Sequence, residues 1–168
     1  MNGQRFISTP VPAAPQPCSP WLRLAHDFPV EDSVRLFAQP CLGDHALHYF
    51  REGSGSYELR GETVPIRPGM LFFVRPGEGY RFTLDPGVRV RMYNLHFDLR
   101  ENERSYRPFP VPPEACRNQE KYPETLPPYQ QLANHPAYEQ CFLRLLDAAS
   151  RIGVEAELER KSELLKLF

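Results

Sequence analysis

The sequence predicts a mainly β fold, a small barrel or a two-sheet jelly roll, followed by two C-terminal α-helices. Between Trp21 and Leu99, short apolar runs are broken by turn residues at intervals of roughly ten, which is typical of all-β domains. The turns place Gly and Pro in the order that tight reversals require, which indicates antiparallel neighbours. After residue 134, apolar residues recur at helical spacing. A length of 168 residues suits one such domain.

The first segment, residues 1–20, is rich in Pro, Ala and Gln and carries five prolines between Pro10 and Pro20. Because proline fixes φ and lacks an amide hydrogen, this segment cannot pack as a helix or as a central strand. We expect a flexible N-terminal arm or lid, with Phe6 and Ile7 as its apolar anchors.

Eight apolar runs in residues 21–99 suit strands, and eight strands are enough for a jelly roll. Glycine turns at Gly53-Ser54-Gly55 and Arg60-Gly61 separate three of them, and Arg67-Pro68-Gly69 has the order of a type II turn. Asp85-Pro86-Gly87 joins the last two strands in a similar way. The expected strands are 21–25, 33–37, 45–51, 56–60, 62–66, 70–75, 80–84 and 88–99.

A polar, proline-rich connection follows over residues 100–135, and two helices are expected in residues 136–168. Pro136 suits the first turn of a helix over 136–152, and Gly153 suits its stop. The second helix, 154–168, reaches the end of the sequence while still amphipathic and without a stop signal. We therefore expect that the natural protein continues beyond it.

The composition excludes strong nucleic-acid binding by these residues themselves. Lys and Arg number 20 against 21 Asp and Glu, a net charge of −1, whereas binding to phosphates needs a cationic surplus on one face. No secretion signal and no membrane span is recognisable, so we expect a cytoplasmic protein. The four cysteines lack metal-ligand or CxxC spacing and are interpreted as reduced thiols without a special role.

The segment from Gly43 to Thr83 resembles the β-barrel module of the cupin superfamily, and more closely the effector-binding half of AraC-type transcription regulators. The resemblance is carried by the turns at 53–55, 67–69 and 75–78 and by the closing Asn94-Leu95-His96-Phe97-Asp98. It covers residues 21–99, and the helices after the connection extend it to the end. It implies a cupin-like double-stranded β-helix, that is, a jelly-roll barrel.

Cupin enzymes hold a divalent metal through histidines and a carboxylate, and the resemblance places the carboxylate at Ala46 and the last histidine at Tyr80. The remaining ligand positions, residues 39–42, hold no histidine. His45 and His48 point to opposite faces of a strand and do not easily share one ion. No nucleophile signature is present either. We therefore expect no metal, no cofactor and no catalytic residues.

A lumen that holds a small molecule is the remaining possibility. If Ala46 faces inward, as the resemblance implies, His48 shares its face by period two. The candidate ligand-binding residues are His48, Tyr80, Phe82, Met92, Asn94 and His96. Four of these candidates have a structural alternative. Tyr80, Phe82 and Met92 could simply fill the core, and His96 could be a satisfied core histidine. His48 and Asn94 are the stronger candidates because burying polar atoms is costly unless something pairs with them.

The helices carry narrow apolar stripes that either the barrel or a second subunit could bury. We expect Phe142 and Leu145 to serve the internal core. Leu158 and Leu165, seven residues apart, are the better candidates for a homodimer interface.

The first functional hypothesis is the sensor and dimerisation domain of an AraC-type regulator. It would bind a small effector, with a sugar suggested by the resemblance, and control DNA binding by a helix-turn-helix domain beyond Phe168. The alternatives are a cupin metalloenzyme, an isomerase or dioxygenase with a rebuilt metal site, and a stand-alone carbohydrate-binding β-module. The sequence does not distinguish an activator from a repressor.

Overall fold

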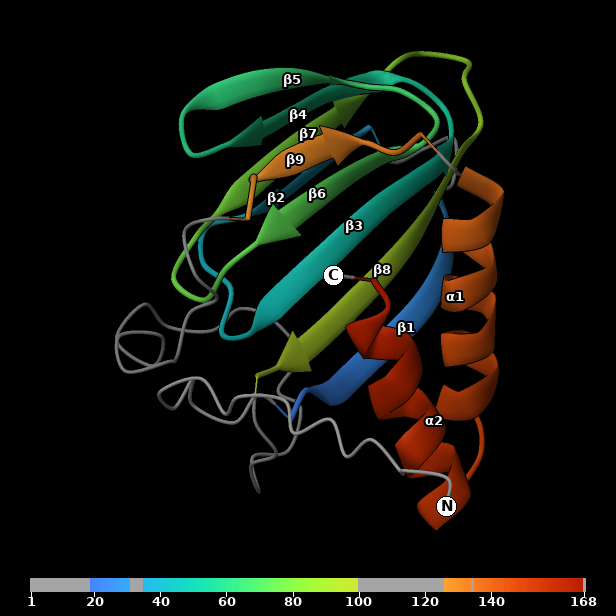
Figure 1. Cartoon of the computed structure of the whole chain (residues 1–168). Helices are drawn as coiled ribbons and strands as arrows, with labels where there is room; N and C mark the ends of the chain where they lie inside the picture. Colours follow the sequence, from blue (N-terminus) through green and yellow to red (C-terminus); the bar gives the residue numbers. More distant parts are fainter. Residues whose placement is uncertain (1–18, 31–34, 100–125, 134, 168) are drawn as a thin grey trace, which may run out of the picture.

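A computed structural model describes residues 19–30, 35–99, 126–133 and 135–167 of the chain. Two antiparallel β-sheets face each other, and two helices cover the outer face of one of them (Figure 1). This confirms the expected mainly β fold with a C-terminal helix pair. In the described parts, no helix is long and apolar enough to cross a membrane.

Sheet A has the strand order β1-β8-β3-β6-β9, and sheet B has the order β2-β7-β4-β5. The alternation of the two sheets along the chain is that of a jelly roll. The strands of sheet A are β1 Trp21–Val30, β3 His45–Glu52, β6 Met70–Val74, β8 Val90–Asp98 and β9 Tyr129–Gln131; those of sheet B are β2 Leu36–Gln39, β4 Gly55–Leu59, β5 Glu62–Ile66 and β7 Tyr80–Leu84.

Two strand predictions were wrong in their bounds. The first strand does not stop at Ala25 but continues to Val30, through Pro29. Proline is tolerated there because β1 pairs only with β8 and lies at the edge of its sheet. The second strand begins at Leu36 and not at residue 33, and residues 31–34 lie outside the described parts.

The strand β9 was not predicted at all. It lies within the expected connection 100–135, where Tyr129, Gln130 and Gln131 pair with Phe72, Leu71 and Met70 of β6. A three-residue polar strand has no alternation to detect, and the neighbouring sheet supplies its partners. The expected arm, with Phe6 and Ile7, and the connection up to residue 125 lie outside the described residues.

The turns have the predicted chemistry. Met70 N–H donates to Arg67 O at 3.1 Å, and Gly69 has a φ of 84°, which fits a type II turn. Arg60 and Gly61, the two residues between β4 and β5, both have positive φ (54° and 81°), as a type I′ hairpin requires. These reversals fix the register in which the inward and outward side chains alternate.

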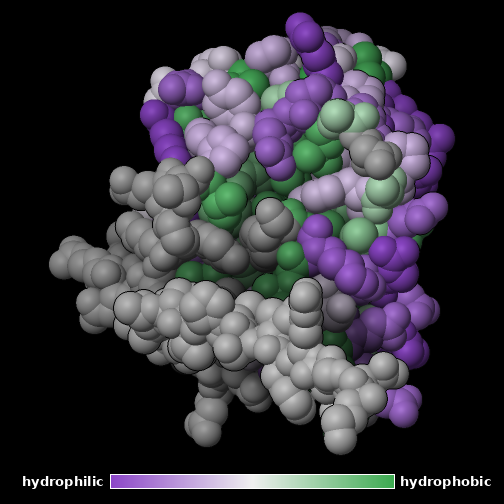
Figure 2. Space-filling view, in the orientation of Figure 1, coloured by the Kyte–Doolittle hydropathy of each residue, from purple (hydrophilic) through white to green (hydrophobic). Residues whose placement is uncertain are grey.

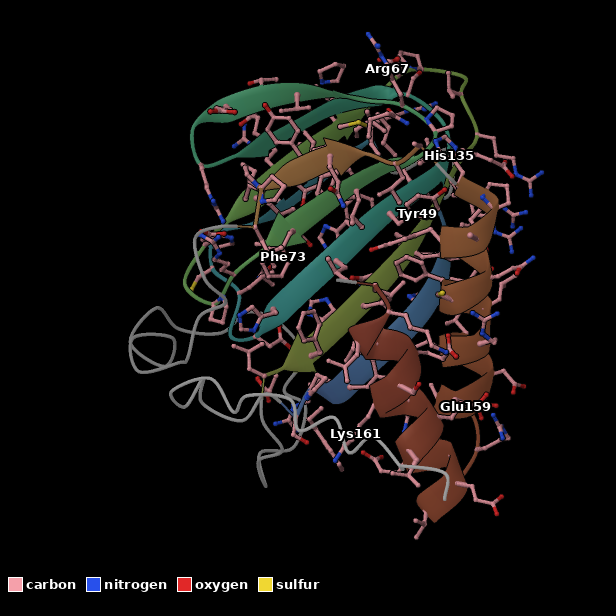
Figure 3. All side chains as sticks on the ribbon, viewed as in Figure 1. Tyr49, Arg67, Phe73, His135, Glu159 and Lys161 are labelled. Carbon is pink, nitrogen blue, oxygen red and sulfur yellow. The ribbon has the colours of Figure 1, made fainter. Side chains whose placement is uncertain are left out.

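Sheet A is buried on both faces, which explains the continuous burial along β6. Its inner face meets sheet B in a core that includes Phe50, Phe72 and Met92. Its outer face packs Tyr49, Tyr93 and other residues against the two helices. Figure 3 shows Tyr49 on this outer side, beside α1.

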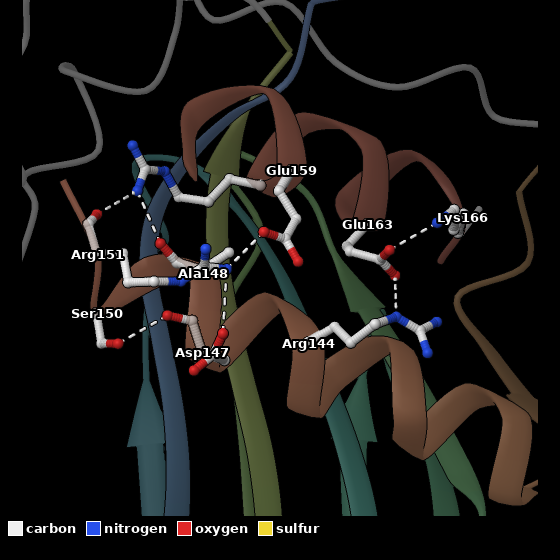
Figure 4. A network of polar contacts seen from close by, with 9 residues as sticks. Arg144, Asp147, Ala148, Ser150, Arg151, Glu159, Glu163 and Lys166 are labelled. Carbon is white, nitrogen blue, oxygen red and sulfur yellow. Dashed lines mark hydrogen bonds and ion pairs between the residues drawn. The ribbon is translucent and has the colours of Figure 1, made fainter. Parts of the chain in front are cut away.

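The helices are α1 His135–Ala149 and α2 Val154–Leu165, close to the predicted ranges. Phe142 and Leu145 of α1 are fully buried against sheet A, which confirms their internal role. Arg160 of α2 donates to the carbonyl oxygens of Ala148 and Arg151 at 2.8 and 2.9 Å, which satisfies the C-terminal end of α1 (Figure 4).

A buried carboxylate joins the two helices. Glu163 on α2 forms ion pairs with Arg144 of α1, at 3.0 Å, and with Lys166, at 2.6 Å (Figure 4). Burial raises the pKa of Glu163, but the hydrogen bonds from Lys166 and Arg144 outweigh it and lower the pKa below its usual value. Glu163 therefore carries its charge at neutral pH and holds the hairpin together.

Candidate functional site

The core between the two sheets, called the lumen below, receives every second residue of β3 and β8, and side chains of both sheets fill it. The two strands pair Ala46 with His96, His48 with Asn94 and Phe50 with Met92. Because paired residues share a face, these side chains point together toward sheet B. Ala46 is part of the inner core, which agrees with the inward direction expected for it.

Sheet B supplies the opposite wall through β7. The Tyr80 ring lies 4.7 Å from the His48 ring, between centroids, and Phe82 belongs to the inner core. The His96 ring lies 6.4 Å from the His48 ring. The structure thus brings the six predicted residues to one inner face and its opposing wall. Their role in ligand binding remains a prediction.

His48 is the centre of the polar part of the lumen. It is 0% exposed, and its Nδ1 lies 2.7 Å from the Tyr57 hydroxyl. Its ring also interacts with the side chain of Asn94, its partner on β8. Burial, with a smaller contribution from nearby His96, lowers the pKa of His48 to about 3, although Asn94 opposes this change. The imidazole is therefore neutral at physiological pH.

Asn94 lies beside His48 in the next strand and between it and His26 of β1. The side chain is partly exposed, but its Oδ1 is buried, and the side chain interacts with the His48 ring. His26 is exposed, so the row of side chains from His26 to His48 leads from solvent to the buried imidazole.

His96 is also 0% exposed and is held by a carboxylate. Its Nδ1 lies 2.9 Å from Oδ1 of Asp44, which immediately precedes β3. Asp98 lies two residues after His96 and on the same face of β8. It binds Arg23, whose Nε lies 2.6 Å from Asp98 Oδ2. These contacts fix the side chains at one end of the lumen.

The rest of the lumen is aromatic and apolar. Tyr57 lies flat on Phe72 with a centroid distance of 3.9 Å, and its ring plane is within 20° of those of Tyr80 and Phe82. Phe82 and Met92 are almost completely buried. They form apolar walls, while Tyr80 is half-buried.

Three residues of this site were missed from the sequence. Tyr57 was placed in a predicted strand, and it alternates with Leu59 onto the inner face. That alternation was the available signal for its inward direction, but its contact with His48 joins two different sheets. Asp44 lies in a loop whose path the strand pattern does not define, and His26 lies beyond the point at which the first strand was expected to end.

The residues do not fit the metal of cupin enzymes. Ala46, at the carboxylate position, has no donor atom, and the described residues contain no group of three or more His, Cys, Asp or Glu arranged to hold an ion. His45 turns to the outer face and stacks on Phe73 and Phe97 at 5.8 and 5.3 Å, so it cannot share an ion with His48, as the sequence indicated.

Among the depressions on the surface of the described residues, two differ in character. One, of about 370 Å³, lies over sheet B and is lined by residues such as Ala38, Glu58 and Arg81. The other, of about 80 Å³, is apolar and lies between sheet A and the end of α2, with Leu71, Leu126 and Leu167 in its lining. Figure 2 shows hydrophobic residues gathered over the middle of this face, where Figure 1 places β6 and β3.

The two residues expected at a dimer interface are not used by the internal core. Leu158 is 63% exposed and Leu165 is 49% exposed. The side of α2 that packs inward carries Ala156 and Leu164 instead. The apolar stripe of Leu158 and Leu165 is thus turned to solvent and available to a partner.

Fold and lumen define the class: a jelly-roll barrel of the cupin type in which the metal-ligand positions hold other residues. The chain belongs to the family of AraC-like ligand binding domains, since the profile of that family matches residues 32–168. No curated protein matches the chain.

Solved structures that match this chain include a predicted oxalate decarboxylase from Thermotoga maritima. The match has 19% identity and a TM-score of 0.41, and it covers 45% of this chain and 65% of that one. A putative mannose-6-phosphate isomerase from Ralstonia eutropha matches at 20% identity and a TM-score of 0.33, over 57% of this chain and 96% of that one. A cupin 2 conserved barrel domain protein from Salinispora arenicola matches at 15% identity and a TM-score of 0.32, over 56% and 91%.

Proposed function

We propose that this chain is the effector-binding and dimerisation domain of an AraC-type transcription regulator. A small molecule would bind in the barrel lumen at His48 and Asn94, and the bound state would control a DNA-binding domain outside these 168 residues. Because the target would be DNA, the proposal includes a cytoplasmic location. It includes no catalysis.

One observation carries the proposal: His48 and Asn94 bring two buried polar atoms, Nε2 and Oδ1, side by side among apolar side chains, where they meet each other and no other described group. Polar atoms buried in an apolar core cost free energy, about 1–3 kcal/mol for each group left unpaired. A ligand that adds hydrogen bonds to this pair would lower the cost. Family membership supports the same assignment.

A route from the lumen to the helices supports regulation. In β3, His48 points into the lumen and its neighbour Tyr49 points outward, where its hydroxyl donates to Glu139 of α1 at 2.9 Å. Tyr138, one residue earlier in α1, donates to the carbonyl oxygen of Leu167 at 2.8 Å, just after α2. A displacement of β3 on ligand binding would therefore reach both helices.

The alternatives are less well supported. A cupin metalloenzyme needs metal ligands, and Ala46 and Tyr80 stand at two of their positions. A stand-alone carbohydrate-binding module leaves the exposed stripe of Leu158 and Leu165 without a role. A stoichiometric Fe, Mn, Ni or Zn content of the purified protein would favour the enzyme instead.

The test is a thermal-shift screen of the purified chain against sugars, organic acids and neutral aromatic compounds, because a ligand that binds only the folded state raises Tm. Asn94→Ala should abolish the shift given by the true effector and leave the fold, measured by circular dichroism, intact. Gln130→Ala, an exposed amide on β9, is the matched control and should retain the shift. An unchanged shift in Asn94→Ala would refute the lumen site.

A further inference from the structure

The depression over sheet B is open to solvent and faces away from the lumen. Its volume of about 370 Å³ falls near the lower end of the range for small-molecule sites, about 300–1,000 Å³. Figure 1 shows sheet B on the side of the barrel away from both helices. A ligand bound here would therefore meet the outward side chains of the sheet and not its filled core.

Small residues make this depression. Ala38, Gly61 and Gly79 lie in its lining and put no long side chain over the sheet. Gly79 could not be larger, because a Cβ built on it would lie 2.4 Å from the carbonyl oxygen of Pro40. The close approach of these two backbone segments keeps the floor low, and Ala38 and Pro40 give it apolar surface.

A loose ion pair lies beside this floor. Arg81 on β7 and Glu58 on β4 are directly paired in the sheet, and both line the depression. Arg81 Nε lies 4.0 Å from Glu58 Oε2, and the side chains are 55% and 49% exposed. Exposed ion pairs add little to stability, so either residue can exchange its partner for a ligand group at small cost.

The other arginine of the lining, Arg60, is held more firmly. Its Nε lies 2.9 Å from Glu78 Oε1, and its Nη2 donates to Glu78 Oε2 at 3.3 Å. The same Oε2 accepts the backbone N–H of Arg75 at 2.9 Å, so the turn after β6 fixes this pair. The groups that can exchange are therefore one guanidinium and one carboxylate, side by side.

These two groups select the charge of a ligand. A guanidinium binds a carboxylate through two parallel N–H donors, and a carboxylate binds an ammonium group. An anion bound to Arg81 would lie next to Glu58, and a cation bound to Glu58 would lie next to Arg81, so each would meet a like charge. A molecule with carboxylate and ammonium on the same carbon atom matches both residues.

We propose that the depression over sheet B binds a free α-amino acid. Its carboxylate would bind Arg81, its ammonium group would bind Glu58, and an apolar side chain would lie over Ala38 and Pro40. This site is separate from the lumen, so the inference goes beyond the proposed function and does not depend on it. Because the site is open to solvent, we expect binding in the millimolar range.

The test compares amino acids with analogues that lack one charge. L-phenylalanine and L-leucine are the zwitterions, 3-phenylpropionate is the matched anion and phenethylamine the matched cation. At about 10 mM, each zwitterion should raise the Tm of the purified chain by about 1–3 °C, and each analogue should give a clearly smaller shift. An equal shift from either analogue, or no shift from both zwitterions, would overturn the inference.

Two threonines on the outer face of sheet B offer matched variants. Thr63 lines the depression and lies opposite Glu58, whereas Thr83 lies opposite Ser56 and outside the lining. Both are exposed. Thr63→Phe should fill the depression and remove the shift by L-leucine, and Thr83→Phe should retain it. A shift that survives in Thr63→Phe would place the binding elsewhere and overturn the site.

A charge variant tests the pairing without filling the depression. Glu58→Gln keeps the size of the side chain and removes its charge, so Arg81 can accept an anion without repulsion. In this variant, 3-phenylpropionate should raise Tm at least as much as L-phenylalanine does, which a merely structural role of Glu58 does not predict. An unchanged preference for L-phenylalanine would contradict the assigned pairing.

Failure of this inference is distinct from failure of the proposed function. A shift by L-phenylalanine that Asn94→Ala abolishes and Thr63→Phe retains would place the amino acid in the lumen. That result would overturn the site on sheet B and support the effector site. Removal of the shift by Thr63→Phe alone supports the site on sheet B and leaves the lumen to its own screen.

Discussion

His45 and His48 stand three residues apart in one strand and show how the same side chain takes different roles. His45 lies against the Phe73 and Phe97 rings on the outer face, whereas His48 lies in the lumen against Tyr57 and Tyr80. Burial lowers the pKa of each to about 3. Both are neutral in the native protein, but only His48 adjoins a polar side chain, Asn94, in the neighbouring strand.

The two histidines predict the direction of acid destabilisation. Their pKa is about 3 when folded and 6.5 in the reference state, so between these values the unfolded chain binds more protons. The contribution of each is complete above pH 6.5 and is lost as pH falls toward 3, by up to about 1.4 kcal/mol per pH unit for each histidine. Urea unfolding at pH 7.5, 6.5 and 5.5 measures this slope. His45→Phe should reduce it by about half, and an unaltered slope would show that His45 does not contribute.

At the scale of elements, the turn before β6 connects the barrel to α1. A Cβ built on Gly69 would lie 2.1 Å from His135 Cε1, in the first residue of α1, and 2.7 Å from Gln131 Nε2. Gln131 in turn donates to the Pro68 carbonyl oxygen at 2.9 Å. The glycine is thus required both by its positive φ and by the close approach of β9 and α1.

Gly69→Ala should therefore cost more than a positive φ alone. Gly87 is the matched control, since it has a similar φ of 74° and nothing within 4 Å of a built Cβ. We expect Gly87→Ala to lower the free energy of unfolding by about 1–2 kcal/mol and Gly69→Ala by about 1 kcal/mol more, because His135 must move. Chemical denaturation measures both. Equal losses would mean that the start of α1 is not held by this turn.

Sequence alternation was sufficient to predict the inner faces of β3 and β8, because turns at both ends fix the register. It could not predict β9, whose three residues pair only because β6 offers a free edge. It also missed Tyr57 as the partner of His48, since that contact joins two different sheets. The helix stripe of Leu158 and Leu165 was visible, but whether the barrel covers it depends on the rotation of α2, which places Ala156 and Leu164 inward.

At the scale of the whole molecule, the helical hairpin presents an unburied apolar stripe to solvent. If this stripe forms the homodimer, replacing Leu158 and Leu165 with glutamate buries charge at the seam and should convert a dimer to a monomer. Sedimentation equilibrium measures the change. Leu36→Glu, an equally exposed leucine on β2 of the other sheet, should leave the dimer intact. A double variant that remains dimeric would place the interface elsewhere.

The central claim is that the effector binds at His48 in the lumen, and side-chain ¹⁵N resonances of the histidines test it most directly. On titration with the compound that raises Tm most, the His48 Nε2 resonance should move in proportion to saturation. The His45 resonances, from the outer face of the same strand, should stay unchanged. Movement of His45 without His48, or of neither, would contradict a lumen site.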